Sequence, residues 1–271
     1  MSRSSKILIS VFLAVPLLFM LWSMLWQFMY GVDAYAVNLD AVLATSSWIH
    51  PLGCDALGRD VLMRLAGGIE LSLMVGIIVI ISGGAIGISI GVIAAWHGGL
   101  VDILLMRLAD IVLSFPGILL AIALAAMLGP AIENLVLALV AVGWVGFARL
   151  TRVQVLSVKT LPYIEAARAN SMSASYIVVR HMLPNIAAPL LVEASFGLAA
   201  VIIGEAGLSF LGVGVQPPDT SLGTMIREGT RMMLVSPALV IWPGLVLFSL
   251  VIAVNLMGDA LRDKLDVRMA Q

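Results

Sequence analysis

Charged residues are scarce in this chain. Asp, Glu, Lys and Arg make up 11% of its 271 residues and 61% are hydrophobic, whereas a soluble domain usually carries about a quarter charged residues. The formal net charge of −1 also argues against the basic surface of a nucleic-acid-binding protein. The composition therefore predicts a membrane protein whose partners include lipid and exclude nucleic acid.

Cysteine is almost absent, and so are the common motifs of catalysis. The single cysteine, Cys54, excludes an internal disulfide, and no spacing of cysteine and histidine resembles a zinc site. There is no G-x-x-x-x-G-K-[ST] phosphate-binding loop and no H-E-x-x-H metal motif. Ser209 lies in GLSFLG instead of G-x-S-x-G, which gives a serine hydrolase little support. We therefore expect no enzymatic activity, cofactor or metal in this chain.

Long apolar blocks are what the chain has instead. The first, over residues 7–30, follows Arg3 and Lys6. It exceeds the ~7–15 apolar residues of a signal peptide, so it is expected to be an anchor. Five more blocks lie at 71–96, 116–128, 135–147, 187–207 and 239–257. The second of these five is expected to begin upstream near Leu104, and Arg107 and Asp110 interrupt it there. Its start is therefore expected to lie at the membrane interface as an amphipathic turn.

The positions of lysine and arginine predict the orientation, because cytoplasmic loops carry an excess of these residues. Six spans place eleven of the fifteen on the side of both termini: Arg3, Lys6, Arg107, Arg149, Arg152, Lys159, Arg168, Arg180, Arg262, Lys264 and Arg268. The other side holds Arg59, Arg64, Arg227 and Arg231. The sequence thus predicts an all-α polytopic membrane protein with about six transmembrane helices and both termini in the cytoplasm.

Two parts of the chain are expected from this layout. Residues 1–66 would form an N-terminal anchor and an outer segment, and residues 67–271 would form the core. A second outer segment runs from about Ser209 to Pro237 and contains GVGVQPPDTSLG, in which Pro217-Pro218 forbids regular helix. An ordinary surface loop and a re-entrant loop both remain open for it.

Small residues follow a helical spacing in the second block. Gly83, Gly87 and Gly91 form two successive GxxxG steps on one helical face. This spacing lets helix backbones approach closely. Packing within the chain is favoured over a contact between subunits.

A polar stretch over about 149–184 separates two apolar blocks. Helices in bundles are usually joined by about 2–8 residues, so this stretch is too long for a simple connection. Small polar residues interrupt its apolar positions, which predicts two short helices on the cytoplasmic face with a turn near 170–173. A short helix with an alanine surface and one carboxylate, Glu165, suits docking into a groove of another protein.

The segment EAARANS…RHMLPN, within residues 163–185, resembles the EAA loop of ABC importer permeases. More specifically, the chain resembles the dipeptide, oligopeptide and nickel permeases in HPLGCDALGRDVLMRL (50–65), RLADIVLSFP (107–116), ARLTRVQVLSVK (148–159), GEAGLSFLGVGVQPP (204–218) and NLMGDALRDKLD (255–266). The likeness covers nearly everything beyond residue 50. It departs from the usual pattern at Ser171, where glycine is usual, Met182 (isoleucine), Cys54 (threonine), Leu222 (tryptophan) and Val267 (proline).

The resemblance implies a permease subunit of a type I ABC importer in the bacterial inner membrane. A second homologous permease would complete the pathway, and a substrate-binding protein outside would deliver the cargo. One or two cytoplasmic P-loop ATPases would hold ATP and Mg and would contact this chain through Glu165, Ala166, Ala167 and Ser171. ATP-driven closure of the ATPases would then rock the spans between inward-open and outward-open states.

Two glutamates fall in or beside the block at 187–207, where an ionisable group is a functional candidate. Glu205 begins the family's E-x-x-L-S-F-L-G motif, so that Glu205, Ser209 and Phe210 are candidates for the translocation path or its gate. Structural hydrogen bonds are the alternative for Glu205 and the favoured interpretation for Glu193. Asp102 has no obvious partner in the sequence.

The cargo stays open at this stage. Di- and oligopeptides come first and nickel or a metal chelate second, because the binding protein does most of the choosing in this family. The three histidines lie too far apart along the topology to form one metal site. A self-contained channel or secondary transporter is the alternative of another class. The two halves show no convincing self-similarity, and that function gives the EAA-like loop no purpose.

Overall fold

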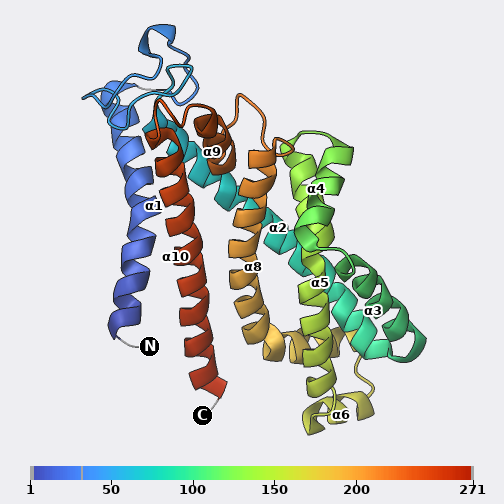
Figure 1. Cartoon of the computed structure of the whole chain (residues 1–271). Coiled ribbons are helices and arrows are strands. Elements are labelled where there is room, and N and C mark those ends of the chain that lie inside the picture. Colours follow the sequence, from blue (N-terminus) through green and yellow to red (C-terminus); the bar gives the residue numbers. More distant parts are fainter. Residues whose placement is uncertain (1–2, 32, 270–271) are drawn as a thin grey trace.

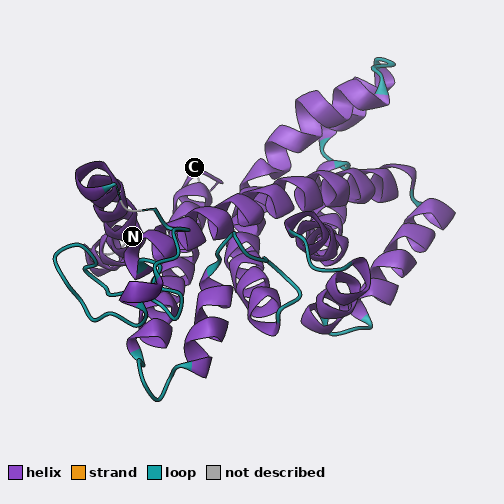
Figure 2. Cartoon of the chain, turned by 90° about the horizontal axis from the view of Figure 1, so that it is seen from above, coloured by secondary structure: helices purple, strands orange, loops and turns teal. Residues whose placement is uncertain are grey.

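The computed structural model describes residues 3–31 and 33–269 and is built almost wholly of helices (Figure 1). Five long helices run along the bundle: α1 (Arg3–Tyr30), α2 (Val61–His97), α5 (Ile132–Val158), α8 (Leu183–Leu211) and α10 (Ala238–Met269). Seen from above in Figure 2, helices and loops make up the whole described part, which contains no strand. The all-α prediction is confirmed.

Four stretches of the described residues are long and apolar enough to cross a membrane as single helices: α2, α5, α10 and the segment 174–211 that ends in α8. A fifth candidate is the pair α3 (Gly99–Leu113) and α4 (Gly117–Leu128), which are bent by 84° at their break. Residues 14–30 of α1 form a shorter apolar helix. With α1 included, these elements match the expectation of about six spans.

The break between α3 and α4 lies at Pro116, which has no N–H to donate and disfavours helical backbone in the residue before it. The start of this block is therefore a full helix at a steep angle to α4, and not a single turn. Asp102 of α3 does have a partner, contrary to the sequence-based expectation. Its carboxylate accepts hydrogen bonds from Arg152 of α5 at 2.5 and 2.6 Å. Asp110 accepts another from Arg149 at 2.5 Å.

The glycine face of α2 packs against α5. A Cβ atom on Gly87 would lie 2.3 Å from the carbonyl oxygen of Trp144, and one on Gly91 would lie 2.5 Å from that of Ala148. Gly83 faces the backbone of Gly143 and Trp144 at about 3.5 Å. The prediction that these glycines serve packing within the chain is confirmed.

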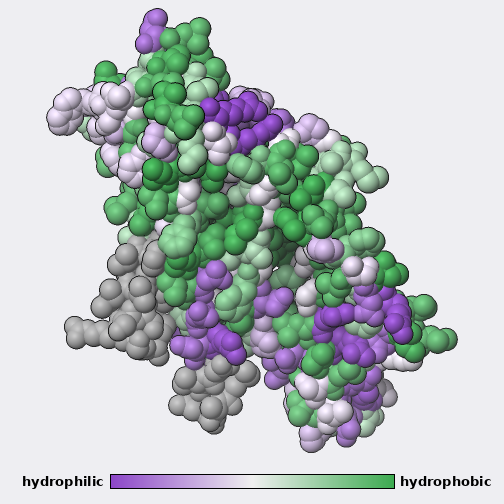
Figure 3. Space-filling view, viewed as in Figure 1, coloured by the Kyte–Doolittle hydropathy of each residue, from purple (hydrophilic) through white to green (hydrophobic). Residues whose placement is uncertain are grey.

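The two ends of the bundle differ. The first turn of α1, the last turn of α10 and the short helix α6 (Pro162–Ala169) lie at one end (Figure 1). The loop over residues 33–60 and α9 (Leu222–Arg231) lie at the other end, as the lysine and arginine distribution predicted for the two outer segments. Figure 3 shows hydrophobic residues over the middle of the visible face and hydrophilic residues gathered toward its ends. This pattern fits a bundle whose middle lies in lipid.

The first helix packs on the last one. Phe19 of α1 lies 6.4 Å from Trp242 of α10, measured between ring centroids. Both rings pack against an apolar cluster whose buried residues include Val61 and Leu239. Leu43 and Leu52 of the outer loop pack against the same cluster. The predicted division of the chain at residue 66 stays a prediction.

Candidate functional site

The polar stretch between α5 and α8 folds into two short helices. These are α6 and α7 (Ala174–Ile177), and a π-helical turn over Val178–Met182 then leads into α8. Pro162 begins α6, where its missing N–H would have had no helical partner. The Ser173 side chain accepts a hydrogen bond from the N–H of Tyr176 and so begins α7. The two helices and the turn near 170–173 predicted from the sequence are confirmed.

Apolar side chains fix α6 on the end of the bundle. Ile164 and Ala167 are buried in a cluster that includes Ala95 from the end of α2. Glu165 and Ala166 are exposed. Helix α6 therefore presents one carboxylate and the two small side chains of Ala166 and Ala169 outward, whereas Ala167, one of the four predicted contact residues, faces inward.

Ser171, another predicted contact residue, is exposed and has φ = +55°. This is the left-handed region, which glycine adopts without cost and residues with a Cβ adopt rarely. The resemblance noted above places a glycine at this position. The fold thus keeps the backbone of that glycine although the residue is serine.

We expect Ser171→Gly to stabilise the turn after α6 by about 1 kcal/mol, because a left-handed backbone costs a residue with a Cβ about 1–2 kcal/mol and glycine escapes most of that cost. Hydrogen exchange of the amides at 168–174 in the detergent-solubilised protein measures this local stability. Ser175→Gly inside α7 is the matched control and should lower protection. Equal loss of protection in both variants would mean that the left-handed backbone at position 171 does not destabilise the turn.

Two cations contact the end of α2, namely Lys159 at the end of α5 and Arg168 of α6, and together they are called the clamp here. The Lys159 ammonium donates hydrogen bonds to the carbonyl oxygens of Ala95 and Trp96 at 2.9 and 2.8 Å. The Arg168 guanidinium lies 4.5 Å from the ring centroid of Trp96. The last carbonyls of a helix have no helical donor and favour nearby cations. Burial, and secondly the charge of Arg168, lowers the pKa of Lys159.

Helix α6 is also tied to the beginning of α8. The Asn185 side-chain amide donates a hydrogen bond to the Tyr163 hydroxyl at 2.8 Å. The His181 ring lies beside the rings of Tyr163 and Tyr176, at centroid distances of 6.3 and 5.7 Å. Through these contacts and the clamp, α6 is attached to α2 and α8 as well as to α5, from which it follows directly.

Glu205 lies where α2, α8 and the loop before α9 meet. Its side chain is fully buried, and its two carboxylate oxygens accept hydrogen bonds from Ser72 and Ser209, each at 2.8 Å. The Ser209 hydroxyl oxygen in turn accepts a hydrogen bond from the N–H of Val215. The structure thus joins Glu205 and Ser209 in one network, and leaves Phe210 apart from it at 41% exposed. A role of the three in the translocation path stays a prediction.

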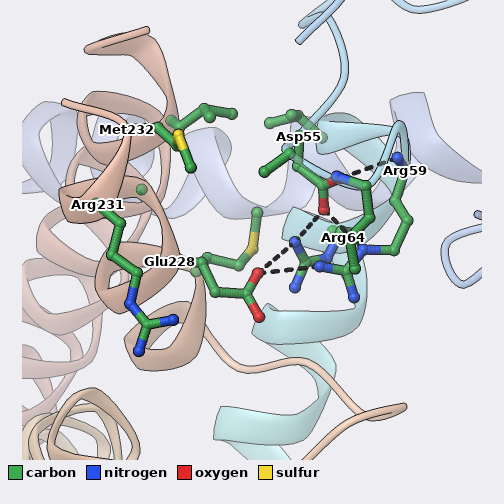
Figure 4. A pocket seen from close by; sticks show the side chains of 12 residues that line it. Asp55, Arg59, Arg64, Glu228, Arg231 and Met232 are labelled. Carbon is green, nitrogen blue, oxygen red and sulfur yellow. Dashed lines mark hydrogen bonds and ion pairs between the residues drawn. The ribbon is translucent and has the colours of Figure 1, made fainter. Parts of the chain in front are cut away.

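A second polar network closes the outer end of the bundle (Figure 4). The Arg59 side chain donates to Asp55 at 2.7 Å and to Glu228 at 3.0 Å. Arg64 donates to the same two carboxylates, at 2.5 and 2.9 Å, and to the Thr220 hydroxyl at 3.2 Å. A cavity of about 250 Å³ lies beside these residues, between the outer segment and α9. Glu228 therefore links α9 to the outer segment and to the first turn of α2.

Sequence reasoning missed this network. A signal was present on one side only, since HPLGCDALGRDVLMRL places Asp55, Arg59, Asp60 and Arg64 within ten positions. Glu228 follows Arg64 by 164 residues, and no local pattern marks it as the partner. The pairing arises from the fold.

Asp60 and His50 of the outer segment also have partners. Asp60 caps α2 by accepting from the N–H of Met63 at 2.8 Å, and its second oxygen contacts His50 at 2.9 Å. Cys54 is 2% exposed, and burial raises the pKa of its thiol to about 11. Among the described residues, no group of three or more His, Cys, Asp and Glu side chains could hold a metal ion.

Two further cavities lie within the bundle. One, of about 330 Å³, lies between α2, α4, α5 and α8, and its walls include Val79, Ala121 and Gly143. The other, of about 340 Å³, lies between α5, α8 and the C-terminal part of α10. Glu193 of α8 lines both, so the two cavities share one carboxylate.

Comparison with known proteins places the chain among transport permeases. Residues 87–271 match the family described as "Binding-protein-dependent transport system inner membrane component". A glutathione transport system permease protein of Pectobacterium atrosepticum is 39% identical over 240 residues, which cover 89% of this chain and 79% of that protein. A dipeptide transport system permease protein of Haemophilus influenzae is 36% identical over 255 residues, covering 92% and 86%.

Solved structures show the same fold. An inward-facing structure of the MetNI methionine ABC transporter contains a chain that matches with a TM-score of 0.60. The match covers 74% of this chain and 95% of that one, at 19% sequence identity. The chain therefore shares the fold of that chain of the MetNI transporter, with the arrangement of helices seen in Figure 1.

Proposed function

Because the chain belongs to the family of binding-protein-dependent transport system inner membrane components, we propose that it is the permease subunit of an ATP-driven importer whose cargo is di- and oligopeptides. The observation that carries this proposal is the similarity to permeases named for dipeptide and glutathione over about nine tenths of the chain. Glutathione is itself a tripeptide. These names favour a peptide over nickel or a metal chelate.

The partners follow from this assignment. A second homologous permease would form the other half of the pathway, and one or two P-loop ATPases holding ATP and Mg would bind on the cytoplasmic side. A substrate-binding protein would deliver the cargo at the outer face of the bacterial inner membrane. The exposed carboxylate of Glu165 and the small Ala166 support α6 as the surface that an ATPase contacts.

The clamp at the end of α2 suggests how movement of α6 reaches the outer face. Arg168 of α6 contacts the ring of Trp96, and Lys159, at the end of α5 just before α6, donates to the carbonyl oxygens of Ala95 and Trp96 in the last part of α2. Helix α2 has 37 residues, which corresponds to about 55 Å at about 1.5 Å per residue. Its first turn carries Arg64 of the outer network. An ATPase that displaces α6 would thus move one rigid element reaching from the cytoplasmic end to the outer network.

Purification of the tagged chain in mild detergent tests the assignment. We expect a second permease and one or two P-loop ATPases to copurify, and the complex in proteoliposomes, supplied with its binding protein, to take up a labelled dipeptide only with ATP. A chain that purifies alone or with copies of itself and transports without ATP would support the self-contained transporter instead.

We expect Glu165→Ala to lower ATP-dependent peptide uptake about thirtyfold, because truncating one partner of a charge pair buried in an interface costs about 2 kcal/mol or more and each 1.4 kcal/mol is tenfold in affinity. Less ATPase should copurify, whereas membrane insertion should be normal because Glu165 is exposed. Glu133→Ala, at an exposed carboxylate in the first turn of α5, is the matched control. Normal uptake and normal assembly of Glu165→Ala would exclude Glu165 from the docking surface.

A further inference from the structure

Glu193 stands between two cavities of the bundle. It lines the cavity enclosed by α2, α4, α5 and α8 and also the cavity enclosed by α5, α8 and α10. Figure 1 shows α8 between α5 and α10. The second cavity is lined by residues from the C-terminal part of α5, the beginning of α8 and the C-terminal part of α10, among them Leu150, Asn185 and Arg262. A molecule that passes from the first cavity to the second would pass this carboxylate.

The Glu193 carboxylate has room around it but no hydrogen-bond or ion-pair partner in the described part of the chain. One of its oxygens lies 2.6 Å from the place where a Cβ on Gly146 would be, so the glycine leaves the space that the side chain occupies. No hydrogen bond or ion pair to Glu193 occurs among residues 3–31 and 33–269. The sequence-based preference for structural hydrogen bonds at Glu193 finds no support there, in contrast to the fully bonded Glu205.

The first cavity is otherwise apolar and lined by small residues. Among the described residues that line it, Glu193 is the only ionisable one. Gly197, Ala200 and Gly204 follow it along the same side of α8 and leave the backbone of that helix close to the cavity. On the side of the first cavity few other dipoles or ions screen the carboxylate, so it interacts strongly with a cation there. The lining of the second cavity also includes the polar residues Gln154, Asn185 and Arg262.

We propose that Glu193 is a binding position for positively charged groups of the cargo, at the junction of the two cavities. The groups of this kind in a peptide are its α-ammonium, lysine ammonium and arginine guanidinium. This inference rests on the proposed peptide cargo and adds the residue that contacts it within the membrane. Apolar walls around one carboxylate tolerate varied side chains and select by charge.

The test compares two tripeptides, Ala-Lys-Ala and Ala-Glu-Ala, delivered by the same binding protein to the reconstituted complex. The ratio of their uptake rates in a variant, divided by that ratio in the unaltered complex, removes the selectivity of the binding protein. We expect Glu193→Gln to lower this ratio about tenfold and Glu193→Lys to lower it further. Glu133→Gln, at an exposed carboxylate outside both cavities, should leave it unchanged.

Three outcomes would overturn the proposal in distinguishable ways. Normal uptake with an unchanged ratio in Glu193→Gln would show that cargo does not contact the carboxylate, and would leave the permease assignment intact. An equal fall in both rates, with less complex recovered, would assign Glu193 a structural role. ATP-dependent uptake of neither tripeptide by the unaltered complex would reject the peptide cargo itself.

Discussion

We expect Gly87→Val to leave little folded protein in the membrane, because a larger side chain at this position pushes α2 away from α5. The added Cβ would lie 2.3 Å from the Trp144 carbonyl oxygen, 2.6 Å from the Phe147 Cβ and 2.9 Å from the Ala148 nitrogen. Two of these are backbone atoms, so no change of side-chain rotamer relieves the contact. Overpacking of this kind costs about 3 kcal/mol or more. The yield of monodisperse protein and the midpoint of its thermal unfolding in detergent measure the effect.

Gly207→Val provides the control for the glycine seam. Gly207 lies inside α8, and a Cβ there would meet nothing within 4 Å. Helix propensity ranks valine slightly above glycine, so Gly207→Val should cost that helix nothing. If Gly87→Val and Gly207→Val gave the same yield and the same midpoint, close packing of α2 on α5 could not be what Gly87 provides.

Features carried by local spacing were predictable. The GxxxG steps at Gly83, Gly87 and Gly91 have the period of a helix face, and a face of glycines has one use in a spanning helix, close approach to another helix. In the polar stretch before α8, the spacing of the apolar residues likewise predicts α6 and the turn that follows it. The left-handed backbone at Ser171 also agrees with the resemblance, because glycine is the usual residue at this position of the EAA loop.

Features that need two distant segments were not predictable. The sequence does not reveal the partner of Asp102, because Arg152 lies 50 residues away on another helix. The resemblance to the EAA loop places Ala167 on the docking surface together with its neighbours Glu165 and Ala166. In the structure the helical period turns Ala167 inward, toward Ala95. For Glu193 the sequence favours structural hydrogen bonds and gives no sign of a cavity. The first cavity beside it forms only when four helices pack together, so no local pattern could predict it.

The outer network is expected to fail when Arg64 loses its charge. Arg64→Met keeps most of the apolar stem but leaves Asp55 and Glu228 with Arg59 as their remaining cation in the network. Removing one partner of a buried ion pair costs about 3–5 kcal/mol; because Arg59 still contacts both carboxylates and Glu228 is partly exposed, the lower end of that range is expected. The outer segment should then separate from α9 at temperatures where the rest of the bundle is still folded.

Cys54 reports on that separation without further engineering, because it is the single cysteine of the chain and lies one residue before Asp55. In the unaltered protein its thiol is buried and its pKa is raised to about 11, so labelling by a maleimide at neutral pH should be slow. Arg64→Met should speed labelling at least tenfold. Arg231→Met, at an exposed arginine of the same cavity that forms no ion pair within the described part of the chain, should not. Equal labelling in both variants would mean that the outer segment is held by its apolar contacts to Val61 and Leu239, with the charges contributing little.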